Sequence, residues 1–318
     1  VVIRFAQSRG YLDVPTARKA HKAPVALLGG VAVFASIALG LLLVSIFVEP
    51  VRNALVGHAS LGALGLGAIL MVALGTWDDL YDMRPMAKLA GQIAIAALTW
   101  AMGFRVGAIE LPFELLLTSA APVSFLVTVG WIVIVSNAFN LIDGIDGLTA
   151  GVSVITALTV FLLANQNGAT VPVIAALALS GALAGFLRFN LPPARIFLGD
   201  AGALSIGYVT AVLAMASYQK SPAAVALIVP LLVLGLPLLD PILAVLRRGL
   251  SHLRRRGAEG LRPGEMLHAV TLADRGHLHH LLLRNGLSVS ESLAVLYAVC
   301  IALAAVGLGT REASTTLR

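Results

Sequence analysis

The sequence predicts an all-α protein: a polytopic integral membrane helical bundle of about ten transmembrane helices, folded as a single domain over residues 1–318. Hydrophobic residues make up 58% of the chain and charged residues only 12%, and the mean hydropathy is +0.93. Soluble domains carry about 25% charged residues, so a chain this apolar could not cover a surface that faces water. Several segments also run for about 20 residues without a charge, which is the length that a helix needs to cross a bilayer of about 30 Å.

Nine complete spans are delimited by charged residues, Gly/Pro clusters and polar stretches. They lie near residues 25–48, 59–76, 87–103, 121–139, 147–164, 171–187, 200–217, 222–246 and 290–308. Residues 1–6 have the composition of the end of a further apolar helix, which brings the expected total to ten. The connection at 105–117 alternates roughly between apolar and polar residues, and we expect it to form a small hairpin on the outer side.

The basic residues predict the orientation of the bundle. One set of alternate connections contains 17 of the 22 Lys and Arg residues, and the other set contains the remaining five. The basic set comprises residues 4–24, 78–88, 140–147, 188–199 and 247–289. Because connections rich in Lys and Arg stay on the cytoplasmic side of a membrane, this set is expected to face the cytoplasm.

Seven acidic residues fall at or just inside the span ends on that same side. They are Asp78, Asp79, Asp82, Asp143, Asp146, Asp200 and Asp240. The orientation rests on Lys and Arg alone, so this agreement independently indicates one acidic pocket surrounded by basic loops. A charge at the centre of a spanning helix costs about 2.5–3.5 kcal/mol, so these carboxylates need partners. Carboxylates bind Mg²⁺ or Mn²⁺ while Lys and Arg bind phosphate oxygens, and the pocket therefore suits a divalent cation with phosphates.

Asp78 and Asp79 form an adjacent pair of carboxylates at the end of one span. A structural interpretation is a solvated helix end that stops the span. The functional interpretation is a metal-associated or proton-accepting pair, because two adjacent carboxylates are poorly accommodated near apolar surface without a cation. Lys88 follows ten residues later and could pair with either Asp or a phosphate, although a lone Lys at a helix start is commonly only an anchor at the membrane surface.

The segment 136–148 is the most specific part of the sequence. Four polar side chains recur in it at regular spacing, among glycines that permit a tight backbone, and they are Asn137, Asn140, Asp143 and Asp146. A turn in which Asp146 caps the next helix would explain one of them. It does not explain four polar groups between two spans, and this segment therefore indicates a site.

Asp200 opens the span at 200–217 and could be an ordinary helix N-cap. A helix N-terminus also presents free N–H groups and the positive end of a dipole to anions. A carboxylate that holds a metal ion beside such groups would form a phosphate site.

A histidine cluster lies in the longest basic loop. It comprises His277, His279 and His280, and it follows Arg275. Zinc binding is one interpretation, but the acids elsewhere favour a hard cation, and the single cysteine, Cys300, lies in the last apolar span. A solvated histidine run is the structural alternative, and binding of a diphosphate or nucleotide is the functional one.

Taken in order, these motifs resemble those of the polyprenyl-phosphate N-acetylhexosamine-1-phosphate transferases of glycosyltransferase family 4, in particular the UDP-GlcNAc:undecaprenyl-phosphate type. The matching motifs are D-x-P-x-x-R-K-x-H from Asp13, the Asp78-Asp79 pair, N-x-x-N-x-x-D-G-x-D-G-L from Asn137, F-x-G-D-x-G from Phe197 and H-x-H-H from His277. The H-x-H-H form is closer to the GlcNAc branch than to the three consecutive histidines of peptidoglycan translocase I. Two features depart from the family pattern: Ala203 replaces the usual Ser, and the stretch 248–274 is longer than expected.

The resemblance implies roles for individual residues. Asp200 would be the main ligand of Mg²⁺ (Mn²⁺ stays open), with Asp79 and Asn140 as further ligands. The catalytic residues would be Asp78, Asp79, Asp143 and Asp146. The substrate-binding residues would be Lys88, Asn137, Asn140, His277, His279, His280, Arg275, Lys19 and His21.

The expected reaction transfers N-acetylhexosamine-1-phosphate, most simply GlcNAc-1-phosphate, from a UDP-sugar to undecaprenyl phosphate with release of UMP. The expected location is a bacterial inner membrane, with the site facing the cytoplasm and a role in cell-envelope polysaccharide synthesis. Membrane lipids are the other expected partners, nucleic acid is not, and a homodimer is left open. The alternatives are a translocase I-like phospho-MurNAc-pentapeptide transferase, a CDP-alcohol phosphatidyltransferase and a cation-coupled secondary transporter, in which intramembrane acids also mark ion paths.

Overall fold

The described part of the protein is a helical bundle with two very short hairpins. The computed structural model describes residues 1–14, 23–106, 109–110, 116–117, 121–218, 231, 234–240, 243 and 278–316. Its described helices are α1 Val2–Arg9, α2 Gly29–Phe47, α3 Glu49–Gly57, α4 Ala59–Tyr81, α5 Pro85–Ala101, α6 Ala121–Ile142, α7 Leu148–Gln166, α8 Thr170–Asn190, α9 Gly199–Tyr218, α13 Leu278–Arg284 and α14 Val289–Thr316. The strands are β1 Leu12–Asp13, β2 Val25–Ala26, β3 Ile109–Glu110 and β4 Leu116–Leu117.

The structure confirms an all-α membrane protein. Within the described part of the chain, seven helices are long and apolar enough to cross a membrane: α2, α4, α6, α7, α8, α9 and α14. The 17-residue α5 corresponds to a further predicted span, and the predicted span at 222–246 falls largely outside the described residues. The total of ten spans therefore stays a prediction.

Several predicted boundaries were wrong in an informative way. Helix α4 continues five residues past the predicted end at 76, and α6 continues three residues past 139. Hydropathy ends a span at the first polar residues, but the backbone hydrogen bonds of a helix do not depend on side-chain polarity. Asp78, Asp79 and Asn140 are consequently helical residues and not loop residues. The predicted connection at 49–58 contains the short helix α3.

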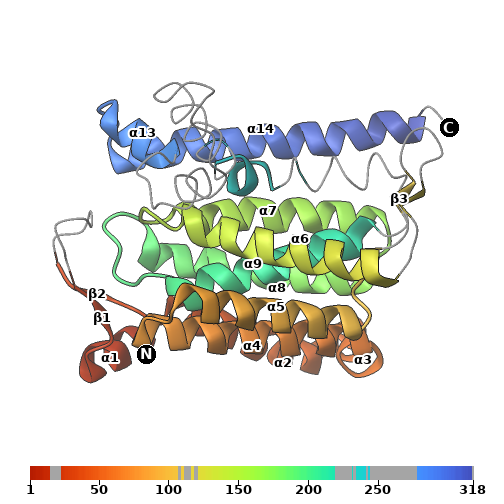
Figure 1. The fold of residues 1–318 in the computed structure, drawn as a ribbon, viewed down its shortest axis with the longest axis horizontal. Helices are drawn as coiled ribbons and strands as arrows, with labels where there is room; N and C mark the ends of the chain where they lie inside the picture. The colour runs from red at the N-terminus through yellow and green to blue at the C-terminus, as the bar shows by residue number, and fades with distance from the viewer. Residues whose placement is uncertain are drawn as a thin grey trace, which may run out of the picture.

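The connections gather at two opposite ends of the bundle (Figure 1). The β1–β2 hairpin and α13 lie at one end, and α3 and β3 lie at the other, where β3 and β4 form the hairpin predicted at 105–117. These positions agree with the division of the connections into a basic set and a second set. Assignment of the first end to the cytoplasm rests on the charge asymmetry and stays a prediction.

Helix α9 forms the centre of the bundle. It packs against α2, α4, α6, α7 and α8, and 78% of its span is buried, the largest share among the candidate spans. Glycines permit its closest contacts. A Cβ added to Gly75 of α4 would lie 2.5 Å from the Cα of Ala201, and one added to Gly30 of α2 would lie 2.1 Å from the backbone N of Gly202. The backbones of three helices therefore meet at the N-terminus of α9, where Asp200 lies.

Candidate active site

Asp78 closes the last turn of α4 and binds a lysine from the next helix. Its Oδ1 accepts a hydrogen bond from the backbone N–H of Met83 at 2.7 Å, and its Oδ2 accepts one from Lys88 Nζ at 2.8 Å. The chain turns sharply between α4 and α5, with Asp82 in the left-handed region at φ 51°. The Asp78 carboxylate therefore bonds both to the backbone of the turn and to the Lys88 ammonium.

Asp200 is the point at which three helices bring polar side chains together. Its Oδ2 contacts Lys88 Nζ of α5, and its Oδ1 accepts a hydrogen bond from Asn140 Nδ2 of α6 at 2.8 Å. The Lys88 ammonium therefore lies between the carboxylates of Asp78 and Asp200. Of the residues predicted to converge from distant parts of the sequence, Asp78, Lys88, Asn140 and Asp200 meet in the structure.

Asp79 caps the N-terminus of α9 from a neighbouring helix. Its Oδ1 accepts a hydrogen bond from the backbone N–H of Asp200 at 2.7 Å, and its Oδ2 accepts one from that of Ala201 at 3.1 Å. Gly199 has φ +66°, and a Cβ there would lie 2.5 Å from Asp79 Oδ2. A glycine is therefore required for Asp79 to reach the helix end. The carboxylate of Asp13 in β1 also lies close enough to repel that of Asp79.

The turn between α6 and α7 carries Asp143 and Asp146. Burial is the main cause that raises the pKa of the Asp143 carboxyl to about 7, and the carboxylates of Asp79 and Asp146 act in the same direction. Asp143 can therefore gain or lose a proton near neutral pH. Asp146 does not cap α7, whose N-cap is Gly147. Its Oδ2 instead accepts a hydrogen bond from the backbone N–H of Ala194 at 2.8 Å, which joins this turn to the loop before α9.

Part of the histidine cluster lies beside this turn. His279 of α13 is 1% exposed, and a Cβ added to Gly144 would lie 2.3 Å from its Nε2. The ring of His280 is 4.2 Å from that of His279. Asp240 is 2% exposed, and its Oδ1 accepts a hydrogen bond from the backbone N–H of Leu278 at the start of α13. The remaining predicted site residues, Lys19, His21, Arg275 and His277, lie outside the described residues.

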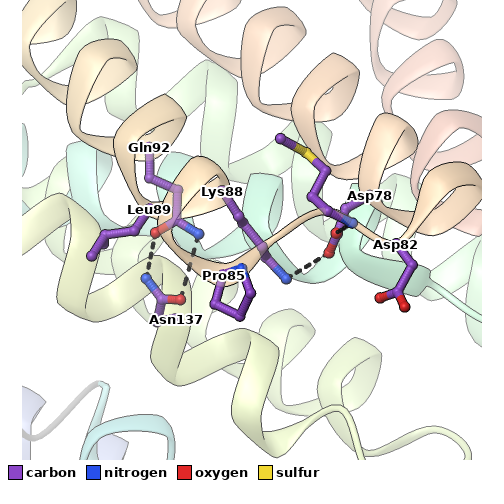
Figure 2. A pocket seen from close by; sticks show the side chains of 8 residues that line it. Asp78, Asp82, Pro85, Lys88, Leu89, Gln92 and Asn137 are labelled. Carbon is purple, nitrogen blue, oxygen red and sulfur yellow. Dashed lines mark hydrogen bonds and ion pairs between the residues drawn. The ribbon is translucent and has the colours of Figure 1, made fainter.

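A cavity of about 310 Å³ opens beside Lys88. Figure 2 shows its lining, which comes from the end of α4, the turn after it, α5 and α6: Asp78, Asp82, Met83, Pro85, Lys88, Leu89, Gln92 and Asn137. Lys88 supplies a positive charge at one part of the wall. The amides of Gln92 and Asn137 face each other at another part, so the cavity has a charged wall and a separate neutral polar wall.

The side chains around Lys88 fit a hard divalent cation. Over the described ranges, no three or more His, Cys, Asp or Glu side chains converge in a metal-binding arrangement. Mg²⁺ typically takes only one or two protein carboxylates and completes its shell with water and substrate phosphates. Asp78 and Asp200 already direct an oxygen each at one cation, the Lys88 ammonium, and the Asn140 carboxamide adjoins Asp200. Two carboxylates, which are ligands of the kind that Mg²⁺ prefers, therefore meet at this site.

Comparison with known proteins assigns the family. The sequence model of glycosyl transferase family 4 matches residues 61–218, from the first turn of α4 to the end of α9. A Bacillus subtilis protein named "Probable undecaprenyl-phosphate N-acetylglucosaminyl 1-phosphate transferase" is 31% identical over 94% of this chain and 77% of its own length. The chain belongs to glycosyl transferase family 4. The resemblance noted from the motifs is thereby confirmed.

Two further relatives place this family 4 transferase among enzymes that act on polyprenyl phosphates. The "Decaprenyl-phosphate N-acetylglucosaminephosphotransferase" of Mycobacterium tuberculosis is 31% identical over 93% of this chain and 74% of its own length. The "Undecaprenyl-phosphate alpha-N-acetylglucosaminyl 1-phosphate transferase" of Escherichia coli is 26% identical over 96% and 78%, respectively. All three names specify N-acetylglucosamine. They do not favour the translocase I, phosphatidyltransferase or transporter alternatives.

The structure of the family 4 transferase adds residues that sequence reasoning did not assign to the site. Asp13 lies near Asp79, and its place in the D-x-P motif was the available signal. Asp240 was identified only as a rim acid, and its contact with the start of α13 was not foreseen. Gln92 was missed because it lies inside an apolar run and pairs with a residue 45 positions away.

Proposed function

We propose that this family 4 transferase moves N-acetylglucosamine-1-phosphate from UDP-GlcNAc to undecaprenyl phosphate, releasing UMP and forming a lipid diphosphate sugar. The observation that carries the proposal is the meeting of Asp78, Lys88, Asn140 and Asp200 from α4, α5, α6 and α9 at one end of a membrane bundle. Phosphoryl transfer requires mainly positioning and neutralisation of charge, and this cluster offers both. The printed names of the relatives support the lipid phosphate and the sugar.

The reaction is a single displacement at phosphorus. An oxygen of the lipid phosphate attacks the β-phosphorus of the UDP-sugar, and a new P–O bond forms. The bond from the β-phosphorus to the bridging oxygen breaks, and UMP leaves with the electron pair. Lys88 lines the cavity, and its ammonium, which pairs with Asp78 and Asp200 in the structure, is the group that we propose contacts the phosphates. A proton on the attacking phosphate passes to Asp78, which lines the cavity, or to Asp143, whose carboxyl has a pKa raised to about 7 by burial.

A divalent cation is part of the proposal. Mg²⁺, or Mn²⁺ in its place, held by Asp200 and Asn140, would neutralise charge on the diphosphate oxygens. Asp79 contributes to the same site by fixing the backbone of Asp200 through its two hydrogen bonds. Each of its carboxylate oxygens keeps a second lone pair with which to bind a cation or its water.

The charge asymmetry supports the orientation that we propose. The site lies at the end of the bundle that also carries the β1–β2 hairpin and α13, whose flanking connections belong to the basic set (Figure 1). We place this end in the cytoplasm, where a nucleotide sugar is available, with the bundle in a bacterial inner membrane. The apolar outer surface of the helices, such as Leu126 and Ile134 of α6, then faces lipid.

The test is release of UMP by purified protein in lipid nanodiscs. Reactions contain undecaprenyl phosphate, Mg²⁺ and one donor from a panel of UDP-GlcNAc, UDP-GalNAc and UDP-MurNAc-pentapeptide. We expect UMP and a lipid-linked sugar with UDP-GlcNAc, and loss of both products on omission of the lipid or addition of EDTA. Absence of a lipid product with every donor would refute the transferase, and a product with another donor alone would refute the sugar.

A further inference from the structure

Gln92 is a buried polar residue that the proposed chemistry does not use. It lies in α5, one helical turn after Lys88, and it is 1% exposed. Buried amides in native proteins are almost always hydrogen bonded, because an unpaired one loses its bonds to water without replacement. The partner of Gln92 therefore indicates why an amide occurs inside an otherwise apolar span.

That partner is Asn137 of α6, and the two amides bind each other reciprocally (Figure 2). Asn137 Nδ2 donates to Gln92 Oε1 at 2.5 Å, and Gln92 Nε2 donates to Asn137 Oδ1 at 3.4 Å. Asn137 Nδ2 also donates to the carbonyl of Val133 at 2.8 Å. A carbonyl can only accept, so this last bond fixes which end of the Asn137 amide carries the nitrogen. Both donor hydrogens of Asn137 are consequently used within the protein.

The pair joins the two helices that bring side chains to Asp200. Lys88 precedes Gln92 by four residues on α5, and Asn140 follows Asn137 by three residues on α6. Residues at these spacings share a helix face. The helices α5 and α6 therefore meet at two levels, first through the Gln92–Asn137 pair and then through Lys88 and Asn140, which both contact Asp200. A rotation or slip of α5 against α6 would break the first contact and displace the second.

We propose that Gln92 is a positioning residue, which acts through its amide pair with Asn137 to hold Lys88 and Asn140 on Asp200. The predicted effect of Gln92 on turnover rests on the proposed function. Because hydrogen bonds depend on orientation, the amide pair sets the register of α5 against α6. Apolar side chains of similar size would fill the same space but would not fix that register. Asn137 accordingly serves the site by fixing α6 and does not donate hydrogen bonds to substrate.

The experiment compares four variants in nanodiscs: Gln92→Leu, Asn137→Leu, the double Leu variant, and the exchanged pair Gln92→Asn with Asn137→Gln. Each single variant leaves the other amide without its reciprocal partner, although Asn137 keeps its bond to the Val133 carbonyl, and it should melt at a lower temperature than the wild type. Removal of both amides relieves that penalty, so the double Leu variant should regain thermal stability. We expect its kcat nevertheless to stay about 10- to 100-fold below that of the wild type, since small displacements of catalytic groups have effects of that size. The exchanged pair should recover both stability and kcat.

Labelling of Lys88 supplies a readout that does not depend on turnover. An amine reagent followed by mass spectrometry should modify Lys88 severalfold more in the double Leu variant than in the wild type, because its ion pairs with Asp78 and Asp200 protect it. Thr99→Val is the matched control, since it removes another buried hydrogen bond of α5, to Tyr208, farther from the site. It should lower the melting temperature without altering Lys88 labelling.

Two outcomes would overturn the proposal: wild-type kcat and Lys88 labelling in the double Leu variant, or losses in the exchanged pair as large as in the double Leu variant. If the wild-type protein forms no lipid product, the proposed function fails, and the labelling pattern still decides whether Gln92 positions Lys88.

Discussion

The two helix pairs that meet at the site are joined by different kinds of contact. Helices α4 and α9 approach backbone to backbone at Gly75 and Ala201, and the Asp79 carboxylate binds backbone N–H groups. Helices α5 and α6 meet through the Gln92–Asn137 amides, beside a cavity of about 310 Å³. Close-packed backbones cannot shift without a clash, whereas side chains at a cavity can change rotamer. Backbone packing therefore presets the side of the site that carries Asp200. On the side that carries Lys88, the amide pair holds α5 and α6 in register, and only the side chains that line the cavity can adjust to substrate.

The largest predicted effect is at Asp200, where both pairs meet. Asp200→Asn should lower kcat about 10²- to 10³-fold, the loss typical of removing one preorganised electrostatic group. Steady-state UMP release measures it, and an unchanged melting temperature shows that the fold is intact. Asp82→Asn is the matched control, because Asp82 lines the same cavity but is exposed and makes no ion pair in the described structure. If both variants lost activity equally, turnover would depend on the total charge of the cavity and not specifically on the cluster at Asp200.

The next effect separates the two adjacent carboxylates of α4. Asp79→Asn places an amide donor against one of two backbone N–H groups, so it should destabilise the protein by about 2 kcal/mol and lower kcat. Asp78→Asn keeps an acceptor for Met83 and weakens mainly the contact with Lys88. Asp78→Asn should therefore lower kcat, but it should destabilise the protein by less than half as much as Asp79→Asn does. Melting curves and kcat for both variants test this order, and equal melting temperatures would contradict the capping role of Asp79.

Sequence reasoning predicted the site better than it predicted the contacts that build it. The convergence of Asp78, Asp200 and Asn140 could be predicted, because charged and polar residues in a membrane bundle need shared partners. The capping of α9 by Asp79 could not, since it depends on a glycine-permitted approach of two backbones. The Gln92–Asn137 pair was equally hidden, because hydropathy patterns report burial and do not report which buried amides face each other.

A comparison of two glycines on α4 tests whether the close backbone contact between α4 and α9 fixes the position of Asp200. A Cβ at Gly75 would meet the Ala201 backbone at 2.5 Å, whereas one at Gly62 would meet nothing within 4 Å. Gly75→Ala should therefore cost about 1–3 kcal/mol, as overpacking of a tight contact does. It should also lower kcat, because Asp200 adjoins the clash. Gly62→Ala should be neutral or stabilise the protein by up to about 1 kcal/mol, since alanine is the better helix former. Melting temperatures in nanodiscs compare them, and a neutral Gly75→Ala would show that α4 and α9 can separate.

The smallest predicted effect tests whether the side chains of α5 that line the cavity beside Lys88 can adjust. Leu89 of α5 lines the open cavity and is only partly buried, so Leu89→Ala removes apolar surface without creating an enclosed void. It should cost about 1 kcal/mol or less, against the 2–5 kcal/mol typical of a leucine truncated in a packed core. We expect kcat to stay at the wild-type value, because Lys88 is held by Asp78 and Asp200 and not by Leu89. A loss of more than about 3 kcal/mol would mean that α5 is packed as firmly as a protein core. In that case the contrast between a preset acid side and an adjustable lysine side would no longer hold.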